Sequence, residues 1–222
     1  WTGEINTESG RIEAQDIYGT RDRSWGVRPV GEPEGGAPGM LVDEPGVYWC
    51  WAPIHFKNFC TQFGTFEDRD GNSTQLSGHQ LPLYKNVSEI PSKVEVKSLS
   101  SLKHSINWEK GTRWSTGAEI KGMTEEKKEF HLKLKTIGPK FFCKGIGYQH
   151  DEWRHGVWKG EAETGYEVWD LENIDPGDHT FFHTHQIVKA SLGSEDGFGT
   201  LENLVIGRHD PSGFKDFFDG AA

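Results

Sequence analysis

Residues 48–56 read YWCWAPIHF, a run in which nearly every side chain is apolar or aromatic. Alternate side chains of an extended strand point to opposite faces, so Trp49, Trp51 and His55 share one face. The opposite face carries Tyr48, Cys50, Ala52, Ile54 and Phe56. A strand that is apolar on both faces is typical of a barrel wall that contacts both a lumen and an outer layer. This stretch therefore predicts a β-barrel.

The remainder of the chain favours an all-β, antiparallel fold with long loops and little helix. Its 28 glycines and ten prolines separate short stretches rich in aromatic and β-branched residues, and no segment keeps the apolar period of a helix. Asp70-Gly71 is a strong hairpin signal, whereas Lys110-Gly111 and Thr164-Gly165 are weaker ones. The expected strands are residues 10–18, 47–56, 61–68, 73–83, 93–99, 104–109, 113–121, 129–136, 147–150, 156–163, 166–171, 180–191 and 197–206.

Composition limits the domain count and the class of partner. A chain of 222 residues suits one large β domain, and its nine Trp, thirteen Phe and five Tyr predict an aromatic-rich core or pocket. A formal net charge of −10 argues against nucleic acid or an anionic membrane surface as a partner, because both bind basic patches. No apolar run is long enough to predict a membrane span.

The three cysteines are Cys50, Cys60 and Cys143, an odd number without metal-like spacing. Free thiols suit a reducing compartment, so we expect a cytoplasmic protein. No signal peptide is visible, but the chain begins at Trp1 without Met, which leaves a removed signal or a preceding domain open.

Residues 19–28 read GTRDRSWGVR and bring three arginines, a carboxylate and a tryptophan together. Two interpretations are open. The cluster is either an Arg–Asp ion-pair clamp that closes the barrel or a functional site at a cavity rim. The Gly- and Pro-rich residues 31–45 that follow predict a surface loop over the mouth of that cavity.

The pattern Gly19-x-Arg21-Asp22-x-Ser24-Trp25-Gly26, followed by the aromatic run 47–56, resembles the signature of a tandem lipocalin-like family. That family includes the carotenoid 1,2-hydratases (hydroxyneurosporene synthases) and the AttH-like proteins. Residues 150–161 and 197–214 are similar to the later part of its bacterial members. The resemblance implies an antiparallel lipocalin-like β-barrel, closed or half-open, that holds a hydrophobic small molecule.

Members of this family usually carry two barrels, with the motif near the start of the second. The resemblance thus implies that residues 1–222 are a single lipocalin-like domain equivalent to the second barrel. A homodimer or a missing partner barrel would then cover its exposed surface. In the hydratases the position of Arg23 is commonly His, so the general acid expected there is missing and alkene hydration is in doubt.

Asp22 is the candidate charged catalytic group, with Arg21 and Arg23 setting the electrostatics around it. His55 is the candidate proton shuttle or orienting donor, because it shares a strand face with two tryptophans. The expected walls of the ligand cavity are Trp25, Trp49 and Trp51, with core packing of these tryptophans as the alternative.

His183 and His185 alternate on a predicted strand, so their side chains point the same way, and we expect them to bind the ligand. Two imidazoles on one face are also typical of a metal site, which Glu202 or His209 could complete. In the usual cupin motif a Glu follows the second His closely, whereas the first acidic residue here is Glu195, beyond a turn. We therefore expect neither a metal nor another cofactor.

These observations predict a cofactor-free lyase, hydratase, isomerase or cyclase acting on a terpenoid, steroid or aromatic compound. A binding module without chemistry is the first alternative, and a cupin-like metal-dependent oxygenase is the second. No Ser–His–Asp elbow, Walker loop or dinucleotide fingerprint is recognisable.

Overall fold

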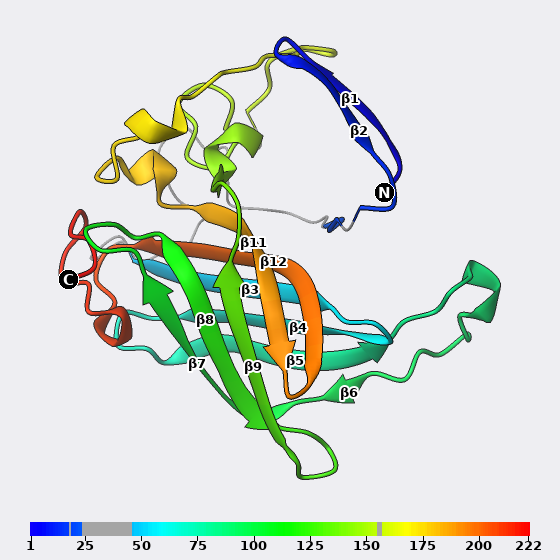
Figure 1. The fold of residues 1–222 in the computed structure, drawn as a ribbon. Coiled ribbons are helices and arrows are strands. Elements are labelled where there is room, and N and C mark those ends of the chain that lie inside the picture. Colours follow the sequence, from blue (N-terminus) through cyan, green and yellow to red (C-terminus); the bar gives the residue numbers. More distant parts are fainter. Residues whose placement is uncertain (18, 24–45, 155–156) are drawn as a thin grey trace.

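The computed structural model describes residues 1–17, 19–23, 46–154 and 157–222. In this part of the chain all regular structure consists of strands and short 3₁₀ helices (Figure 1). The strands are β1 (Gly3–Thr7), β2 (Gly10–Ala14), β3 (Val47–His55), β4 (Phe59–Glu67), β5 (Ser73–Pro82), β6 (Lys97–Ser98), β7 (Ser100–Trp108), β8 (Ser115–Met123), β9 (Glu129–Thr136), β10 (Phe141–Phe142), β11 (Thr184–Leu192) and β12 (Glu195–Ile206). The 3₁₀ helices are η1 (Val87–Glu89), η2 (Cys143–Ile146), η3 (Leu171–Asn173), η4 (His179–Phe181) and η5 (Asp210–Ser212).

Ten strands form one antiparallel sheet in the order β6-β5-β4-β3-β12-β11-β9-β8-β7, with β10 paired to β11. The two ends of this order meet, because only Leu99 separates β6 from β7 in the chain. The backbone N–H of Leu99 donates to the carbonyl of Gly78 in β5 at 2.9 Å. The sheet thereby curls into a nearly closed barrel, which confirms the prediction of an antiparallel lipocalin-like fold.

Apolar side chains fill the interior of the barrel. Tyr48, Cys50, Ala52 and Ile54 of β3 face it, together with Phe56 directly after the strand. Ile120, Leu132, Val188 and Leu201 meet them from β8, β9, β11 and β12. Burying such a side chain contributes roughly 1.5–3 kcal/mol, so this alternation fixes which face of each strand turns inward.

The tryptophans of β3 lie on the outside of the barrel. We expected Trp49 and Trp51 to line a cavity within it, but both alternate with the core residues and are only half-buried. The two-residue period of the strand separated the faces correctly, yet both faces are apolar. The sequence therefore could not show which of them faces the lumen.

Two of the three turn predictions are confirmed. Asp70-Gly71 joins β4 to β5, and Lys110-Gly111 joins β7 to β8; both glycines have positive φ, 85° and 75°. Thr164-Gly165 is not a hairpin, and the strands expected at 147–150, 156–163 and 166–171 are absent from the described part of that region. Trp169 of this region packs edge-on against Phe181 of η4, whereas Trp158 and Tyr166 are exposed. The expected loop 31–45 lies outside the described residues.

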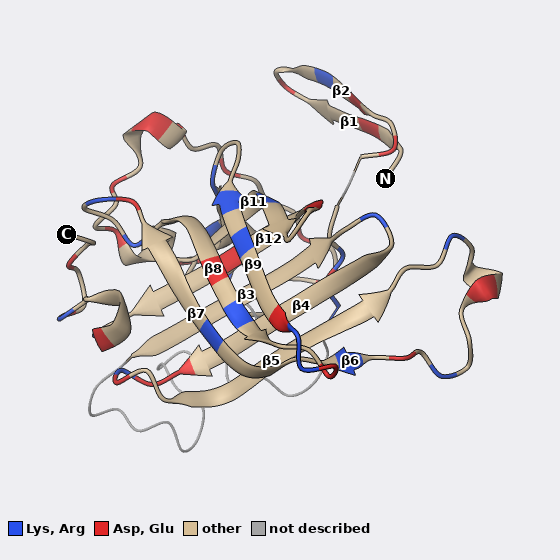
Figure 2. Cartoon of the chain, turned by 60° about the horizontal axis from the view of Figure 1, so that its bottom comes forward, with Lys and Arg blue, Asp and Glu red and all other residues tan. Residues whose placement is uncertain are grey.

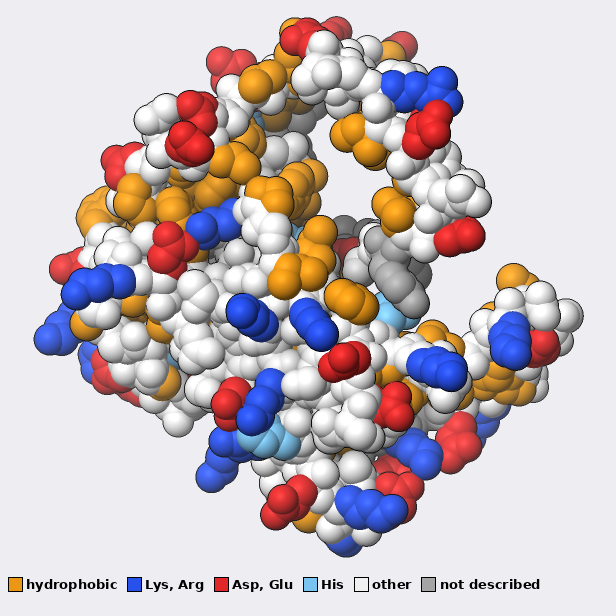
Figure 3. Space-filling view, in the orientation of Figure 1, with side chains coloured by type: hydrophobic (Ala, Val, Ile, Leu, Met, Phe, Trp, Pro, Cys, Tyr) orange, Lys and Arg blue, Asp and Glu red, His pale blue; other side chains and the backbone are white. Residues whose placement is uncertain are grey.

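The described residues between β9 and β11, 137–154 and 157–183, form an excursion that extends beyond the barrel (Figure 1). Trp114, Phe142 and Phe181 anchor this excursion in a small second core. The hairpin β1–β2 stands away from the barrel (Figure 1). In space-filling view, a hollow separates the hairpin from the barrel (Figure 3).

Arg113 holds the C-terminal segment against one end of the barrel. Its side chain is 1% exposed and forms a 2.7 Å ion pair with Asp219. Its remaining N–H groups donate to the backbone carbonyls of Gly207, Asp216 and Asp219 at 2.7–2.8 Å. The buried Arg–Asp clamp of this protein is therefore formed by Arg113, at a position the sequence did not single out.

Charges of both signs are interspersed over β7, β8 and β9 (Figure 2). Glu119, for example, pairs with both Lys121 and His131 on this surface. Among the described residues, no helix is both long and apolar enough to cross a membrane.

Candidate functional site

The adjacent strands β3, β12 and β11 carry Trp49, Trp51, His55, His185 and Glu202 on their outer faces. In the register of the sheet, Glu202 of β12 lies opposite Trp51 of β3 on one side and opposite His185 of β11 on the other. Phe198 of β12 lies opposite His55 of β3 in the same way. The strand pairing thus gathers side chains that are up to about 150 residues apart in the sequence into one band.

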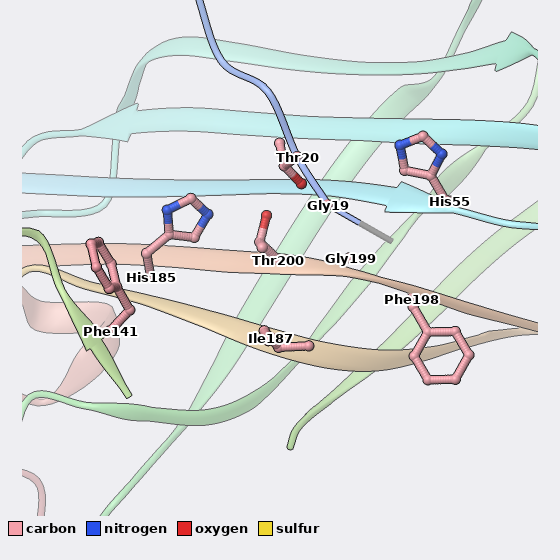
Figure 4. A pocket seen from close by; sticks show the side chains of 9 residues that line it. All are labelled: Gly19, Thr20, His55, Phe141, His185, Ile187, Phe198, Gly199 and Thr200. Atoms are coloured by element: carbon pink, nitrogen blue, oxygen red, sulfur yellow. The ribbon is translucent and has the colours of Figure 1, made fainter. Parts of the chain in front are cut away.

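A mainly apolar pocket of about 280 Å³ lies over this band (Figure 4). Its floor comes from β11 and β12, with Ile187 and Thr200 in the middle, and His55 and His185 also face it. Phe141 of β10 and the backbone around Gly19 complete it from outside the barrel. Apolar walls with a few polar groups are typical of a small-molecule site.

Glu202 is the centre of the polar contacts beside this pocket. Its Oε1 accepts a hydrogen bond from the indole N–H of Trp49 at 3.0 Å and lies 2.7 Å from Nε2 of His183. Burial by itself raises the pKa of this carboxyl. The hydrogen bond from His183 and the nearby imidazoles outweigh burial, so the pKa of Glu202 lies below its usual value.

Cys143, the first residue of η2 in the excursion between β9 and β11, lies next to this group. One ligand atom each of Cys143, His183 and Glu202 lies within 4.8 Å of the others. The backbone N–H of Cys143 donates to the carbonyl of His183 at 2.9 Å, extending the β10–β11 pairing. Burial, and secondarily the charge of Glu202, raises the pKa of the Cys143 thiol. No local signal marked Cys143, because its role depends on a contact 40 residues away in the chain.

His185 connects this polar group to the pocket. Its Nε2 is buried and has no hydrogen-bond partner among the described residues, and its ring meets that of Trp51 edge-on at 6.1 Å. Burial lowers the pKa of His185, whereas the carboxylates of Glu202 and Asp22 act in the opposite direction. Asp22, which the sequence singled out, therefore lies near His185.

Of the run 19–28, the structure describes residues 19–23. Arg21, Asp22 and Arg23 are all exposed. Two further members of the run, Trp25 and Arg28, lie outside the described residues. Gly19 and Thr20 line the outer pocket, so the described part of the run borders a cavity, and the ion-pair clamp stays the alternative interpretation.

The sequence missed a second polar cluster, which lies inside the barrel. The hydroxyl of Tyr48 is 2.6 Å from Nε2 of His104. Glu67 has one carboxylate oxygen 3.6 Å from Nδ1 of His104 and the other 3.2 Å from Nε2 of His209. Burial lowers the pKa of His104 and raises that of Tyr48. His209, which could have completed a site with His183, thus belongs to this separate cluster.

This internal cluster borders a pocket of about 360 Å³ in the barrel wall. Leu76 of β5 and Leu102, Ile106 and Trp108 of β7 line it. β5 and β7 meet only near Gly78, so the wall is open beside Leu76, which is 43% exposed. The described residues thus line a pocket on the outer surface of the barrel and another in its wall. A third pocket, of about 600 Å³, lies in the segment between β9 and β11, where Phe141, His150, Trp153 and Trp169 line it.

Comparisons with known proteins place the chain in a family. Neither the curated proteins nor the solved structures include a significant match to it. A family model described as "Family of unknown function (DUF8625)" matches residues 1–215. Because this match spans nearly the whole chain, the protein belongs to the family of unknown function DUF8625.

Proposed function

We propose that this protein binds a hydrophobic small molecule, of terpenoid, steroid or aromatic type, in the pocket over β3, β12 and β11. The observation that carries the proposal is the convergence of Gly19, His55 and His185 on one mainly apolar pocket. Three segments far apart in the sequence supply these residues. Concave apolar surfaces with a few oriented polar groups are the usual form of a ligand site.

The catalytic form of the proposal is lyase, hydratase, isomerase or cyclase chemistry on the bound molecule. His55 faces the pocket directly, and an imidazole can donate or accept a proton near neutral pH. Asp22 follows Thr20, which lines the pocket, by two residues, and its charge acts on His185. We assign proton transfer to His55 and electrostatic stabilisation of positive charge in the substrate to Asp22.

The resemblance to the tandem lipocalin-like family supports a hydrophobic ligand, although Arg23 stands where the hydratases commonly have His. The free thiols of Cys50, Cys60 and Cys143 agree with a cytoplasmic location. A binding module without chemistry uses the same pocket. An enzyme would convert the bound molecule into a product, whereas a binding module would leave it unchanged.

The first test is native mass spectrometry of the purified protein, followed by binding of the fluorescent probe 1-anilinonaphthalene-8-sulfonate to three variants. Thr200→Phe fills the outer pocket, Thr200→Val changes the hydroxyl but hardly the volume, and Leu76→Phe fills the pocket in the barrel wall. We expect Thr200→Phe to weaken binding by about tenfold or more, equivalent to ~1.4 kcal/mol. The other two variants are expected to bind like the wild type.

Loss of binding in Leu76→Phe, with Thr200→Phe unaffected, would instead place the ligand inside the barrel and overturn the proposal. An organic mass retained by the purified protein identifies the ligand class. Incubation of that compound with wild type and His55→Ala then shows whether it is converted.

A further inference from the structure

Cys143, His183 and Glu202 form a buried group of three different metal-ligating side chains. Cys143 is 1% and His183 2% exposed, and their ligand atoms, with one carboxylate oxygen of Glu202, lie within 4.8 Å of one another. Buried polar groups normally satisfy one another by hydrogen bonds. Here His183 contacts Glu202 through Nε2, but Nδ1 of His183 has no hydrogen-bond partner among the described residues.

We propose that these three residues bind one divalent transition-metal ion of the zinc class. A thiolate, an imidazole and a carboxylate are all ligands that Zn²⁺ accepts, and three protein ligands leave one coordination position for water. The proposal concerns a site beside the apolar pocket and does not depend on what that pocket binds.

The backbone holds the three ligands in place before any ion binds. Cys143 and His183 are joined by a 2.9 Å backbone hydrogen bond, and Glu202 lies on β12, which pairs with β11 immediately after His183. Ligand atoms around a tetrahedral Zn²⁺ are roughly 3.3–3.8 Å apart. Side-chain movements of about 1 Å therefore bring the three atoms to that spacing.

The charges of the group also fit a divalent cation. A thiolate and a carboxylate carry two negative charges, which one Zn²⁺ ion neutralises while the imidazole remains uncharged. The indole of Trp49 donates a hydrogen bond to Glu202 at 3.0 Å and orients that carboxylate, as outer groups do around metal sites.

A catalytic Cys–His–Glu arrangement is the competing interpretation of the same side chains. Reactive cysteines are partly exposed, whereas Cys143 is fully buried. The structure therefore favours a metal ligand over a nucleophile at this position.

The test is a titration of the complete chain with Co²⁺ after treatment with a chelator. A thiolate bound to Co²⁺ gives a charge-transfer band in the near ultraviolet that nitrogen and oxygen ligands do not give. We expect this band to reach its maximum at one equivalent of Co²⁺ and to disappear when Zn²⁺ is added. The absence of the band in the wild type overturns the proposal, whether or not Co²⁺ binds elsewhere.

Variants assign the ligands. Cys143→Ala is expected to lose the band, while Cys60→Ala, which alters a cysteine on β4, keeps it. Glu202→Gln is expected to keep the band but to bind Co²⁺ at least about tenfold more weakly. His185→Ala is expected to keep it too, because His185 is not one of the three ligands. A band that persists in Cys143→Ala, or vanishes in Cys60→Ala, contradicts the assignment, and circular dichroism verifies that each variant is folded.

Discussion

Glu202 and His183 lie 2.7 Å apart through Oε1 and Nε2, on a face of the barrel that the excursion covers. Glu202→Ala removes the partner of a fully buried imidazole and also the acceptor of the Trp49 indole. Because unpaired buried polar groups are costly, we expect a loss of about 1–3 kcal/mol in the free energy of unfolding. Urea denaturation measures it, and Glu202→Gln, which keeps an acceptor oxygen, should lose less. Equal losses in the two variants would contradict this explanation.

Arg113 should be among the most sensitive positions in the protein. Arg113→Met leaves the Asp219 carboxylate and four backbone carbonyls without their donor inside the structure. Breaking a buried ion pair by removing one partner costs roughly 3–5 kcal/mol. Thermal and urea denaturation measure this loss. Arg208→Met removes an exposed arginine paired with Asp210 and is the matched control, with an expected effect of less than about 1 kcal/mol.

The stability of the barrel should decrease as the pH falls below neutrality, partly through His104. Burial lowers the pKa of His104 from its ordinary value of 6.5, so the unfolded chain takes up this proton before the folded one does. The free energy of unfolding therefore falls as the pH passes below 6.5 toward the pKa of the folded state. The groups around His104 are Tyr48, Glu67 and His209.

Urea denaturation of wild type and His104→Gln at pH 7 and pH 5.5 tests this effect. The wild type should lose more stability between the two pH values than the variant loses. The quantity compared is the change in the free energy of unfolding between pH 7 and pH 5.5. Any pH-independent cost of the substitution therefore cancels. Equal differences would show that His104 does not contribute.

Gly199 is required where β12 passes closest to β3. A Cβ at this position would collide with the backbone carbonyl of Pro53 and lie 2.9 Å from Cα of Ile54. We expect Gly199→Ala to destabilise the protein by about 1–3 kcal/mol and to disturb the outer pocket. Gly64→Ala in β4 is the control, since its Cβ would make only ordinary contacts, the nearest at 3.5 Å. Similar losses of stability for both variants would refute the steric explanation.

Asp22→Asn separates a functional from a structural role for the run 19–28. Asp22 is exposed, so the substitution should change the free energy of unfolding by no more than about 0.5 kcal/mol. If the proposed chemistry is correct, turnover of the bound compound falls while its binding remains. A large drop in melting temperature would instead support the clamp.

The sequence predicted the fold because strand periodicity and turn chemistry are local. The alternation over residues 48–56 and the glycines at 71 and 111 each depend on a few neighbouring positions. The same reasoning failed for residues 147–170, where aromatic residues suggested strands. There the described chain forms no strand: Trp169 packs against Phe181 while Trp158 and Tyr166 are exposed, and only the tertiary structure decides that.

For the candidate site, too, the sequence predicted some features and only the structure decided the others. The sequence by itself identified Asp22, His55, His183 and His185 from their residue types, and it placed Trp49 and Trp51 on the same strand face as His55. Only the tertiary structure decided that this face is the outer one, that Cys143 and Glu202 meet His183, and that His104 and His209 share Glu67 within the barrel. These contacts depend on the register of strands that are distant in the chain, and that register follows from packing the whole core.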